Sequence, residues 1–496
     1  MMRVKKWLKR LGLIFALPAV LVLALALWAS ARLLLYDQVD DEAHLAEKQD
    51  YLEQLRILSS SVDMRDRTTR PNIVFILYDD LGYGDLGAFG AEAIKTPNID
   101  ALAATGIRLT QFYSPSPVCT PSRAGFLTGR MPPRAGLSNV VHPEGSAFDA
   151  VVKIEGQNVR LPVEEITIAD MLSAAGYRTA MIGKWHLGDV SPSLPNEFGF
   201  ESFFGSLYSN DMEPFALYRD GKIEVEAPVD QAGLNARYTQ EAVDFIRREA
   251  DSGQAPFFLY FAHNFPHVPQ YVEADREGRS EAGLYGDVVE ALDDGVGQIV
   301  GALDEAGALG DTIIVITSDN GPWWQGDPSS LRGRKGDTYE GGMRVPFIVH
   351  WPGRLEGGRE ATGMAMGIDL LPTFADWLHL PLPADRMIDG RSMASMLEDG
   401  AGTPHDYLFY FAVDDVLAVR NTKHKLIGVH NATYGPMNVP IAISSAQGPW
   451  LINLELDPRE AYDTSLHDPG LARVMADVLE AKRTEMEANP RGWIEH

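Results

Sequence analysis

The chain has almost no cysteine. Its 496 residues contain a single one, Cys119, so an intramolecular disulfide cannot form. A fold without disulfides depends on its core, and a large core is available here because 45% of the residues are hydrophobic. Length and composition predict one large domain and a smaller one, and neither internal repeats nor low-complexity segments are evident.

Positive charge is also scarce. The formal net charge is -26, from 43 lysines and arginines against 69 aspartates and glutamates. So acidic a chain repels phosphate at long range, which argues against nucleic acids and other polyanions as partners. An anionic substrate must therefore be held by individual lysines, arginines or histidines, or by a metal ion.

The long apolar run of the chain lies at its N-terminus. A basic segment, Met1 to Arg10, precedes a mostly apolar stretch from Leu11 to Ala31 that continues past Arg32 to Leu35. This order predicts a cytoplasmic segment (1–10), a transmembrane anchor (11–35) and export of the remainder to the periplasm or another extracytoplasmic space. Cleavage at the small residues Ala29-Ser30-Ala31 is the alternative, and it would release a secreted or periplasmic protein.

The segment after the anchor, residues 36–70, is polar and acidic. Leu45, Leu52, Leu55 and Leu58 recur at helical spacing within it, which predicts a short amphipathic helix in a stalk or linker. A large α/β domain is predicted over 71–389. Short strand candidates and a terminal helix over 471–488 predict a smaller C-terminal subdomain over 390–496.

The segment around Cys119 is unusually constrained. Pro121 suits the first turn of a helix, so Cys119 should lie at a helix N-terminus with Arg123 one turn further on, on the same face. Such a cationic, dipole-positive pocket is expected to lower the pKa of a thiol and to attract an anion. A buried cysteine that acts as a small apolar side chain is the alternative interpretation.

Two apolar runs end in acidic or amide side chains. Residues 72–78 read as a strand buried on both faces and lead into Asp79-Asp80, and residues 312–317 lead in the same way towards Asp319-Asn320. Because ligands bind at the carboxyl ends of parallel strands, these four side chains are expected to meet. Their oxygens predict a site for a hard cation, calcium or magnesium, although each pair alone is common turn chemistry.

Two further apolar runs end in titratable side chains. Residues 178–183 lead to Lys184 and His186, and residues 256–262 lead to His263 and His267. A lone histidine or lysine near a core is usually structural. Four strand ends that all carry polar, titratable groups are not required by core packing, so these residues are candidates for catalysis.

The motifs resemble those of the type I sulfatases. The resemblance rests on Cys119-Thr120-Pro121-Ser122-Arg123 with Ala124 to Arg130, on Gly183 to Gly188, on the acid pairs, and on Lys335 before Glu340-Gly341-Gly342. It implies that Cys119 is oxidised to formylglycine by a formylglycine-generating or sulfatase-maturating enzyme. It also implies Ca²⁺, or Mg²⁺, held by the modified Cys119 with Asp79, Asp80, Asp319 and Asn320.

The resemblance further implies roles for the cations and histidines. Arg123 and Lys184 would hold the modified side chain, His186 would act in its turnover, and His267 and Lys335 would lie nearest the substrate oxygen. The implied reaction converts a sulfate monoester to an alcohol and sulfate. The implied fold is of the alkaline phosphatase type: an α/β/α domain with a mostly parallel sheet and a small antiparallel C-terminal sheet.

Substrate identity stays open at this stage. Aryl, steryl, lipid and carbohydrate sulfates are all compatible, and Trp323 and Trp324 could stack on a ring or serve as packing anchors. A phosphonate or phosphate ester hydrolase is one alternative, although Asn320 stands where the phosphonate monoester hydrolases carry histidine. A catalytically inactive, sulfatase-like binding protein is the other.

Overall fold

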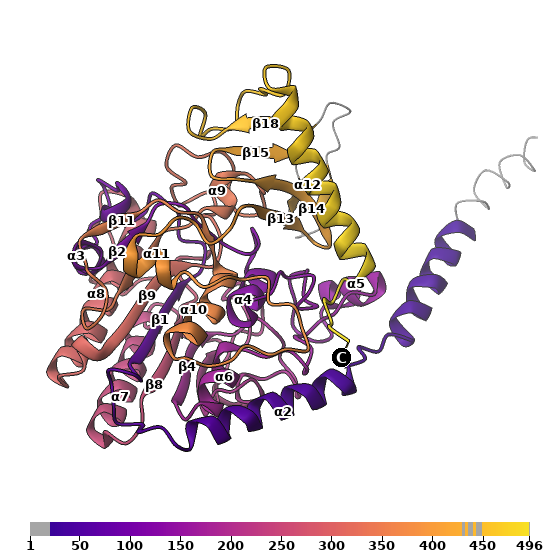
Figure 1. The fold of residues 1–496 in the computed structure, drawn as a ribbon. Helices are drawn as coiled ribbons and strands as arrows, with labels where there is room; N and C mark the ends of the chain where they lie inside the picture. Colours follow the sequence, from indigo (N-terminus) through magenta and orange to yellow (C-terminus); the bar gives the residue numbers. More distant parts are fainter. Residues whose placement is uncertain (1–19, 429–431, 435–439, 443–448, 496) are drawn as a thin grey trace, which may run out of the picture.

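The computed structural model describes residues 20–428, 432–434, 440–442 and 449–495. Its centre is a ten-stranded sheet in the order β11-β2-β10-β9-β1-β8-β4-β5-β6-β7 (Figure 1). The five adjacent strands that run parallel are β9 (Thr312–Ser318), β1 (Asn72–Tyr78), β8 (Phe257–Ala262), β4 (Arg178–Lys184) and β5 (Ser202–Ser206). The predicted mostly parallel sheet is confirmed.

Antiparallel strand pairs extend the sheet on both sides of the parallel strands. On one side β10 (Phe347–His350) pairs antiparallel with β9 and with β2 (Ile107–Leu109), and β2 pairs in parallel with β11 (Arg359–Ala361). On the other side β6 (Leu217–Arg219) and β7 (Lys222–Val225) continue from β5 as an antiparallel hairpin.

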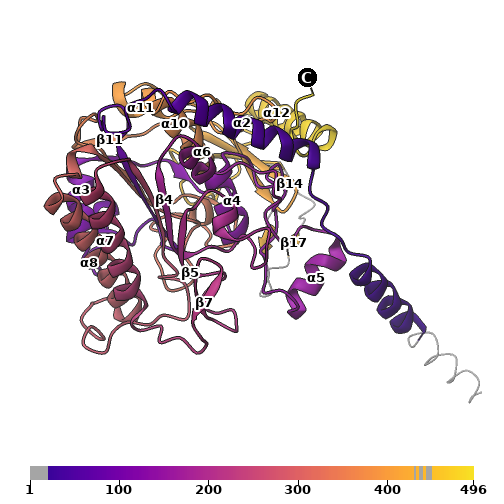
Figure 2. The ribbon, with the colours of Figure 1, turned by 90° about the horizontal axis from the view of Figure 1, so that it is seen from below.

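Helices cover both faces of the sheet because its strands are apolar on both faces. In β1, Ile73 and Phe75 join one buried cluster while Val74 and Ile76 join another. The first cluster is closed by α4 (Cys119–Thr128), α6 (Ile168–Ala174), α10 (Leu370–Trp377) and α11 (Ala394–Asp399). The second is closed by α3 (Pro97–Thr105), α7 (Leu234–Ser252) and α8 (Gly283–Glu305) (Figure 2). The result is the expected α/β/α arrangement.

The helix predicted in the stalk is present, but it does not stand apart from the large domain. Helix α2 (Glu42–Ser59) packs beside α6, where Tyr51 and Leu55 enter the first cluster. The buried Lys48 ammonium lies 3.0 Å from Asp170 Oδ2 and donates to the carbonyl of Glu165 at 2.7 Å. Much of segment 36–70 therefore packs on the large domain and does not act as a spacer.

The predicted transmembrane helix is not found in the part of the chain that the structure describes. Residues 20–34 form a helix with exposed apolar side chains, but no described helix is long and apolar enough to cross a bilayer. Residues 1–10 and the first part of the predicted anchor, 11–19, lie outside the described residues.

A second, smaller sheet follows the large domain. Its four antiparallel strands are β13 (Leu408–Ala412), β14 (Asp415–Arg420), β15 (His424–Ile427) and β18 (Trp450–Asn453), and α12 (Pro469–Ala488) packs on them. The predicted small antiparallel sheet with a terminal helix is confirmed. The boundary at residue 389 stays a prediction, and α11 beyond it still packs in the core of the large domain.

The described fold also contains several short helices and strands. They are α5 (Ala147–Glu155), α9 (Glu340–Met343), and the paired strands β3 (Phe112–Tyr113) with β12 (Ala365–Met366) and β16 (Ala432–Tyr434) with β17 (Pro440–Ala442). Helix α9 begins at Glu340, whose side chain contacts two strands of the small sheet.

Buried ion pairs join the large domain to the small sheet. Glu340, at the start of α9, lies 3.2 Å from Lys425 Nζ and 3.4 Å from Arg420 Nη1. Lys425 also contacts Glu460 Oε1 at 2.9 Å, and all four side chains are buried. Removing one charge from such a cluster leaves another uncompensated in a medium of low dielectric constant.

We therefore expect Lys425→Met to lower the free energy of unfolding by about 3–5 kcal/mol, because Glu340 and Glu460 lose their shared cation. Urea unfolding followed by tryptophan fluorescence measures this change. The matched control is Lys423→Met, which removes an exposed ammonium paired with Glu455 at 3.3 Å and should cost less than about 1 kcal/mol. Equal losses in the two variants would contradict a structural role for the buried cluster.

Candidate active site

Cys119 is the first residue of α4, as predicted. Val118 precedes it in an extended conformation, and the helix ends at Gly129, whose φ of 68° is left-handed. A Cβ atom at Gly125 would lie 2.5 Å from Pro115 Cβ, so glycine allows α4 to pack against the segment that leads into Cys119. The helix is buried over its whole length.

Arg123 lies one turn after Cys119 and connects α4 to two strand ends. Its Nε donates to Asp319 Oδ2 at 2.8 Å and its Nη1 donates to the carbonyl of Lys184 at 2.7 Å. Its Nη2 is 3.9 Å from Asp79 Oδ2 and has no hydrogen-bond partner. The guanidinium therefore sets the position of Cys119 relative to β9 and β4.

The acid pairs after β1 and β9 converge as expected. The strands are parallel and in register from Asn72 opposite Thr312 to Tyr78 opposite Ser318, so the residues that follow lie abreast. The Asp80 amide donates to Asp319 Oδ1 at 3.3 Å, and Asn320 Nδ2 donates to Asp80 Oδ1 at 2.7 Å. Asp80 has a left-handed φ of 67°, an unfavourable conformation that recurs at functional sites.

The two consecutive acids have different cationic partners. Asp79 Oδ2 lies 2.5 Å from Lys184 Nζ, whereas Asp80 Oδ1 lies 2.8 Å from Lys335 Nζ. Burial alone would raise the pKa of Asp79, but Lys184 and the other nearby cations hold it well below its usual range. Asp79 is therefore ionised, and its Oδ1 lies 3.3 Å from Cys119 Sγ.

The pKa of the Cys119 thiol is raised, not lowered as the sequence predicted. Burial is the largest cause and the Asp79 carboxylate adds to it, while Lys184 and Lys335 act in the opposite direction. The local helix terminus and Arg123 do not outweigh this environment. At neutral pH the side chain is a thiol.

His186 is buried and neutral. Burial and the adjacent Lys184 hold its pKa well below the usual range. Its Nε2 lies 3.0 Å from the carbonyl of Val141, which makes Nε2 the protonated nitrogen, and its buried Nδ1 has no partner. An unpaired imidazole nitrogen of this kind can accept a proton.

His267 lies on the other side of the acid cluster. Its Nε2 is 3.7 Å from Asp80 Oδ2, and its Nδ1 contacts the carbonyl of Val268 at 2.5 Å and Ser209 Oγ at 3.3 Å. Burial and Lys335 lower its pKa. With Nδ1 engaged, Nε2 is the nitrogen that faces the cluster.

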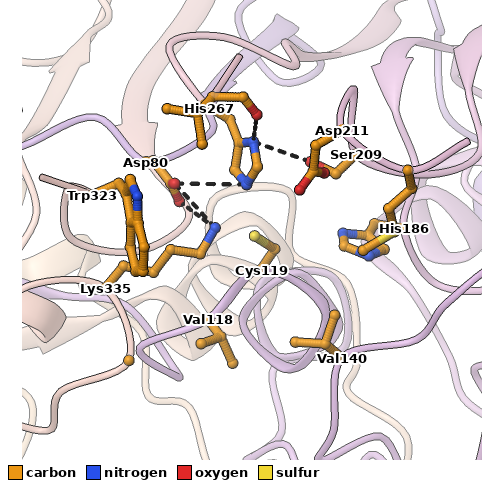
Figure 3. A pocket seen from close by; sticks show the side chains of 13 residues that line it. Asp80, Val118, Cys119, Val140, His186, Ser209, Asp211, His267, Trp323 and Lys335 are labelled. Atoms are coloured by element: carbon orange, nitrogen blue, oxygen red, sulfur yellow. Dashed lines mark hydrogen bonds and ion pairs between the residues drawn. The ribbon is translucent and has the colours of Figure 1, made fainter. Parts of the chain in front are cut away.

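A cavity of about 190 Å³ is lined by Asp80 and by Cys119, Lys335, His186 and His267 (Figure 3). Cys119 lies between Lys335 and His186, with His267 above it in the view. The sequence predicted these four residues, and it left His263 aside, which is buried outside the cavity lining. The structure adds Ser209, Asp211 and Met212, which follow β5 and were not predicted as site residues.

The oxygen ligands fit a hard cation. Asp79 and Asp80 form a compact buried group with Cys119 and His267 in which one potential ligand atom from each lies within 4.8 Å of the others. Asn320 Oδ1 is buried without a hydrogen-bond partner although its amide nitrogen is engaged, so an acceptor oxygen is left available beside Asp80. Carboxylate and amide oxygens are the ligands that calcium and magnesium prefer.

Fold and site together define a hydrolase of anionic esters. A nucleophile position at a helix N-terminus, two buried cations (Arg123 and Lys184), the partly buried Lys335 and a cluster of acids meet at the carboxyl edge of a parallel sheet, where α/β proteins bind ligands. The cations can hold an anionic group, and the two histidines can move protons beside it.

The sequence matches the family described as "Sulfatase" over residues 71–380, and "N-sulphoglucosamine sulphohydrolase, C-terminal" over 334–487. Arylsulfatase A of Homo sapiens is 37% identical over 456 residues, which cover 83% of this chain and 86% of that protein. N-acetylgalactosamine-6-sulfatase of Canis lupus familiaris is 36% identical over 376 residues, covering 72% and 71%.

Among solved structures, the PsFucS1 sulfatase from Pseudoalteromonas sp. superimposes with a TM-score of 0.75 at 28% identity, covering 91% of this chain and 96% of that one. The chain belongs to the type I sulfatase family of the alkaline phosphatase superfamily. It is thus a sulfuric ester hydrolase.

Proposed function

We propose that the protein is an arylsulfatase-like enzyme in which Cys119, converted to formylglycine, is the nucleophile. It hydrolyses a sulfate monoester to an alcohol and inorganic sulfate. The observation that carries this proposal is the position of Cys119 Sγ, 3.3 Å from the ionised Asp79 and within a cavity also lined by Lys335, His186 and His267.

The environment of Cys119 supports modification over direct use of the thiol. Burial and Asp79 raise the pKa of the thiol, so the reactive thiolate is disfavoured at neutral pH. A formylglycine hydrate supplies two neutral hydroxyls at the same position, one to attack sulfur and one whose deprotonation expels sulfate. The second of these functions is not available to a thiol or to a single hydroxyl.

The surrounding side chains supply the remaining functions. Lys184 and Arg123 hold the position of the nucleophile, and Lys335 compensates the negative charge of the ester. His267, when protonated at Nε2, can donate a proton to the departing alcohol oxygen. The unpaired Nδ1 of the neutral His186 is suited to accept the proton of the second hydroxyl.

Asp79, Asp80, Asp319 and Asn320 would hold the calcium or magnesium ion that is general to the family. When bound, the ion supplies positive charge beside the ester and increases the acidity of a hydroxyl next to it. Burial raises the pKa of Asp319 to about 7, and the Asp79 carboxylate adds to this effect.

The purified protein is expected to release inorganic sulfate from an aryl sulfate in the presence of calcium, with much slower hydrolysis of the matching aryl phosphate. A chelator should abolish release and also lower the thermal midpoint, because an ion present at about 100 times its Kd stabilises a folded protein by about 2.7 kcal/mol. Faster hydrolysis of the phosphate would favour the phosphate or phosphonate ester alternative. No hydrolysis of either ester by protein with modified Cys119 would favour an inactive binding protein.

Maturation and location are part of the same proposal. Cys119 is 3% exposed and all of α4 is buried, so a formylglycine-generating or sulfatase-maturating enzyme would have to act before α4 packs. Export, with attachment to a membrane through the N-terminal segment, is supported by the exposed Leu21, Leu25 and Trp28 of the helix over 20–34. N-terminal sequencing and detergent extraction of the native protein separate attachment from cleavage and release.

A further inference from the structure

The active-site cavity holds one lysine and no arginine among the described residues that line it. That lysine is Lys335, and its ammonium is already paired with Asp80 at 2.8 Å. The rest of the lining beyond the catalytic groups is mainly apolar: Val118, Val140, Met212, Val268 and Trp323. After the sulfate has been bound, little positive charge is left for a second anionic group.

The carboxylate of Asp211 also borders the cavity. Asp211 is exposed and lies on the side of the cavity away from Trp323, with Cys119 and His267 between them (Figure 3). In the described part of the chain, no hydrogen bond or ion pair holds this carboxylate. An unpaired acid directed at the substrate space is available to a ligand and does not serve the fold.

A neighbouring cavity is likewise poor in positive charge. It shares Met212 with the active-site cavity, and its lining contains Glu144 and Asp189 but neither lysine nor arginine among the described residues. Tyr208 also lines this second cavity, and its hydroxyl donates to the carbonyl of His142 at 2.9 Å. The space into which a larger substrate would extend is therefore acidic as well.

We propose that Asp211 is a specificity-determining residue that selects substrates with a single sulfate on an otherwise neutral or cationic, largely apolar group. Its carboxylate accepts a hydrogen bond from a hydroxyl or ammonium group of the substrate and repels a second sulfate or a carboxylate. Trp323 and Met212 pack against the apolar part. This inference rests on the proposed sulfatase function and excludes polysulfated carbohydrate chains as good substrates.

Three aryl sulfates matched in size test the proposal, with para-aminoethyl, para-hydroxyethyl and para-carboxymethyl groups. Protein with modified Cys119, verified by mass spectrometry, is expected to show kcat/KM values for the cationic and the anionic probe that differ by about tenfold or more, since one unit charge acts with opposite sign on the two. Asp211→Asn should bring this ratio closer to one, and Asp211→Lys should invert it.

The matched control is Glu226→Gln, which removes the same charge from an exposed residue outside the cavity lining and should leave the ratio unchanged. Circular dichroism and the thermal midpoint verify that each variant is folded. Equal kcat/KM values for the three probes in the parent, or an unchanged ratio in Asp211→Asn, overturn the inference while the sulfatase function stands. Failure of the modified parent to hydrolyse any of the three overturns both.

Discussion

Replacing Cys119 with alanine is expected to reduce kcat for sulfate ester hydrolysis by roughly 10⁴-fold or more, because the covalent route is lost while the surrounding cations remain. The thermal midpoint should change little, since only one small buried side-chain atom is removed. Sulfate release and circular dichroism on the same preparation measure the two effects.

The Cys119→Ser variant distinguishes a nucleophile with two hydroxyls from one with a single hydroxyl. Serine can attack sulfur and release the alcohol, but it has no second hydroxyl to expel sulfate. We therefore expect one equivalent of alcohol per enzyme and a protein mass increased by one SO₃ group, followed by arrest. Steady turnover by this variant, or full activity of Cys119→Ala, would contradict the role given to Cys119.

Loss of the Arg123 charge is expected to have a large effect on stability as well as on activity. Arg123 is fully buried, with Asp319 at 2.8 Å and Asp79 at 3.9 Å from its guanidinium nitrogens. Arg123→Met leaves both carboxylates without this partner and should lower the free energy of unfolding by about 3–5 kcal/mol. Urea unfolding in the presence of a chelator measures the change without any contribution from a bound cation.

Two variants serve as controls for Arg123→Met. Arg123→Lys keeps the charge but cannot reproduce the paired contacts with Asp319 and the Lys184 carbonyl, so it should recover part of the stability and little of the activity. Arg247→Met removes an exposed partner of Glu305 and should cost less than about 1 kcal/mol. Stability of Arg123→Met equal to that of Arg247→Met would contradict the proposed electrostatic role.

The parts of the site that follow long apolar strands could be predicted from the sequence. Asp79 and Asp319 come after strands of β-branched and aromatic residues, and parallel strands bring their carboxyl ends to one edge. Cys119 was predictable as a helix N-terminus because Pro121 suits the first turn of a helix. These are local signals with a direct geometric consequence.

Other parts depend on contacts between residues far apart in the chain. Asp211 and Ser209 follow β5, a short strand of sequence Ser-Phe-Phe-Gly-Ser without a long apolar run, so nothing local indicates that they reach the cavity. The raised pKa of the Cys119 thiol arises from burial and from Asp79, forty residues away along the chain. Periodicity predicted a helix near Leu55, but not that it packs on the large domain.

Peptide mass spectrometry across Cys119, on protein from its native host, tests the central claim most directly. The same sample is treated with an aldehyde-reactive probe and assayed for sulfate release. The account predicts an aldehyde at position 119, with activity proportional to its occupancy. An unmodified thiol in folded protein that still hydrolyses sulfate esters would contradict it.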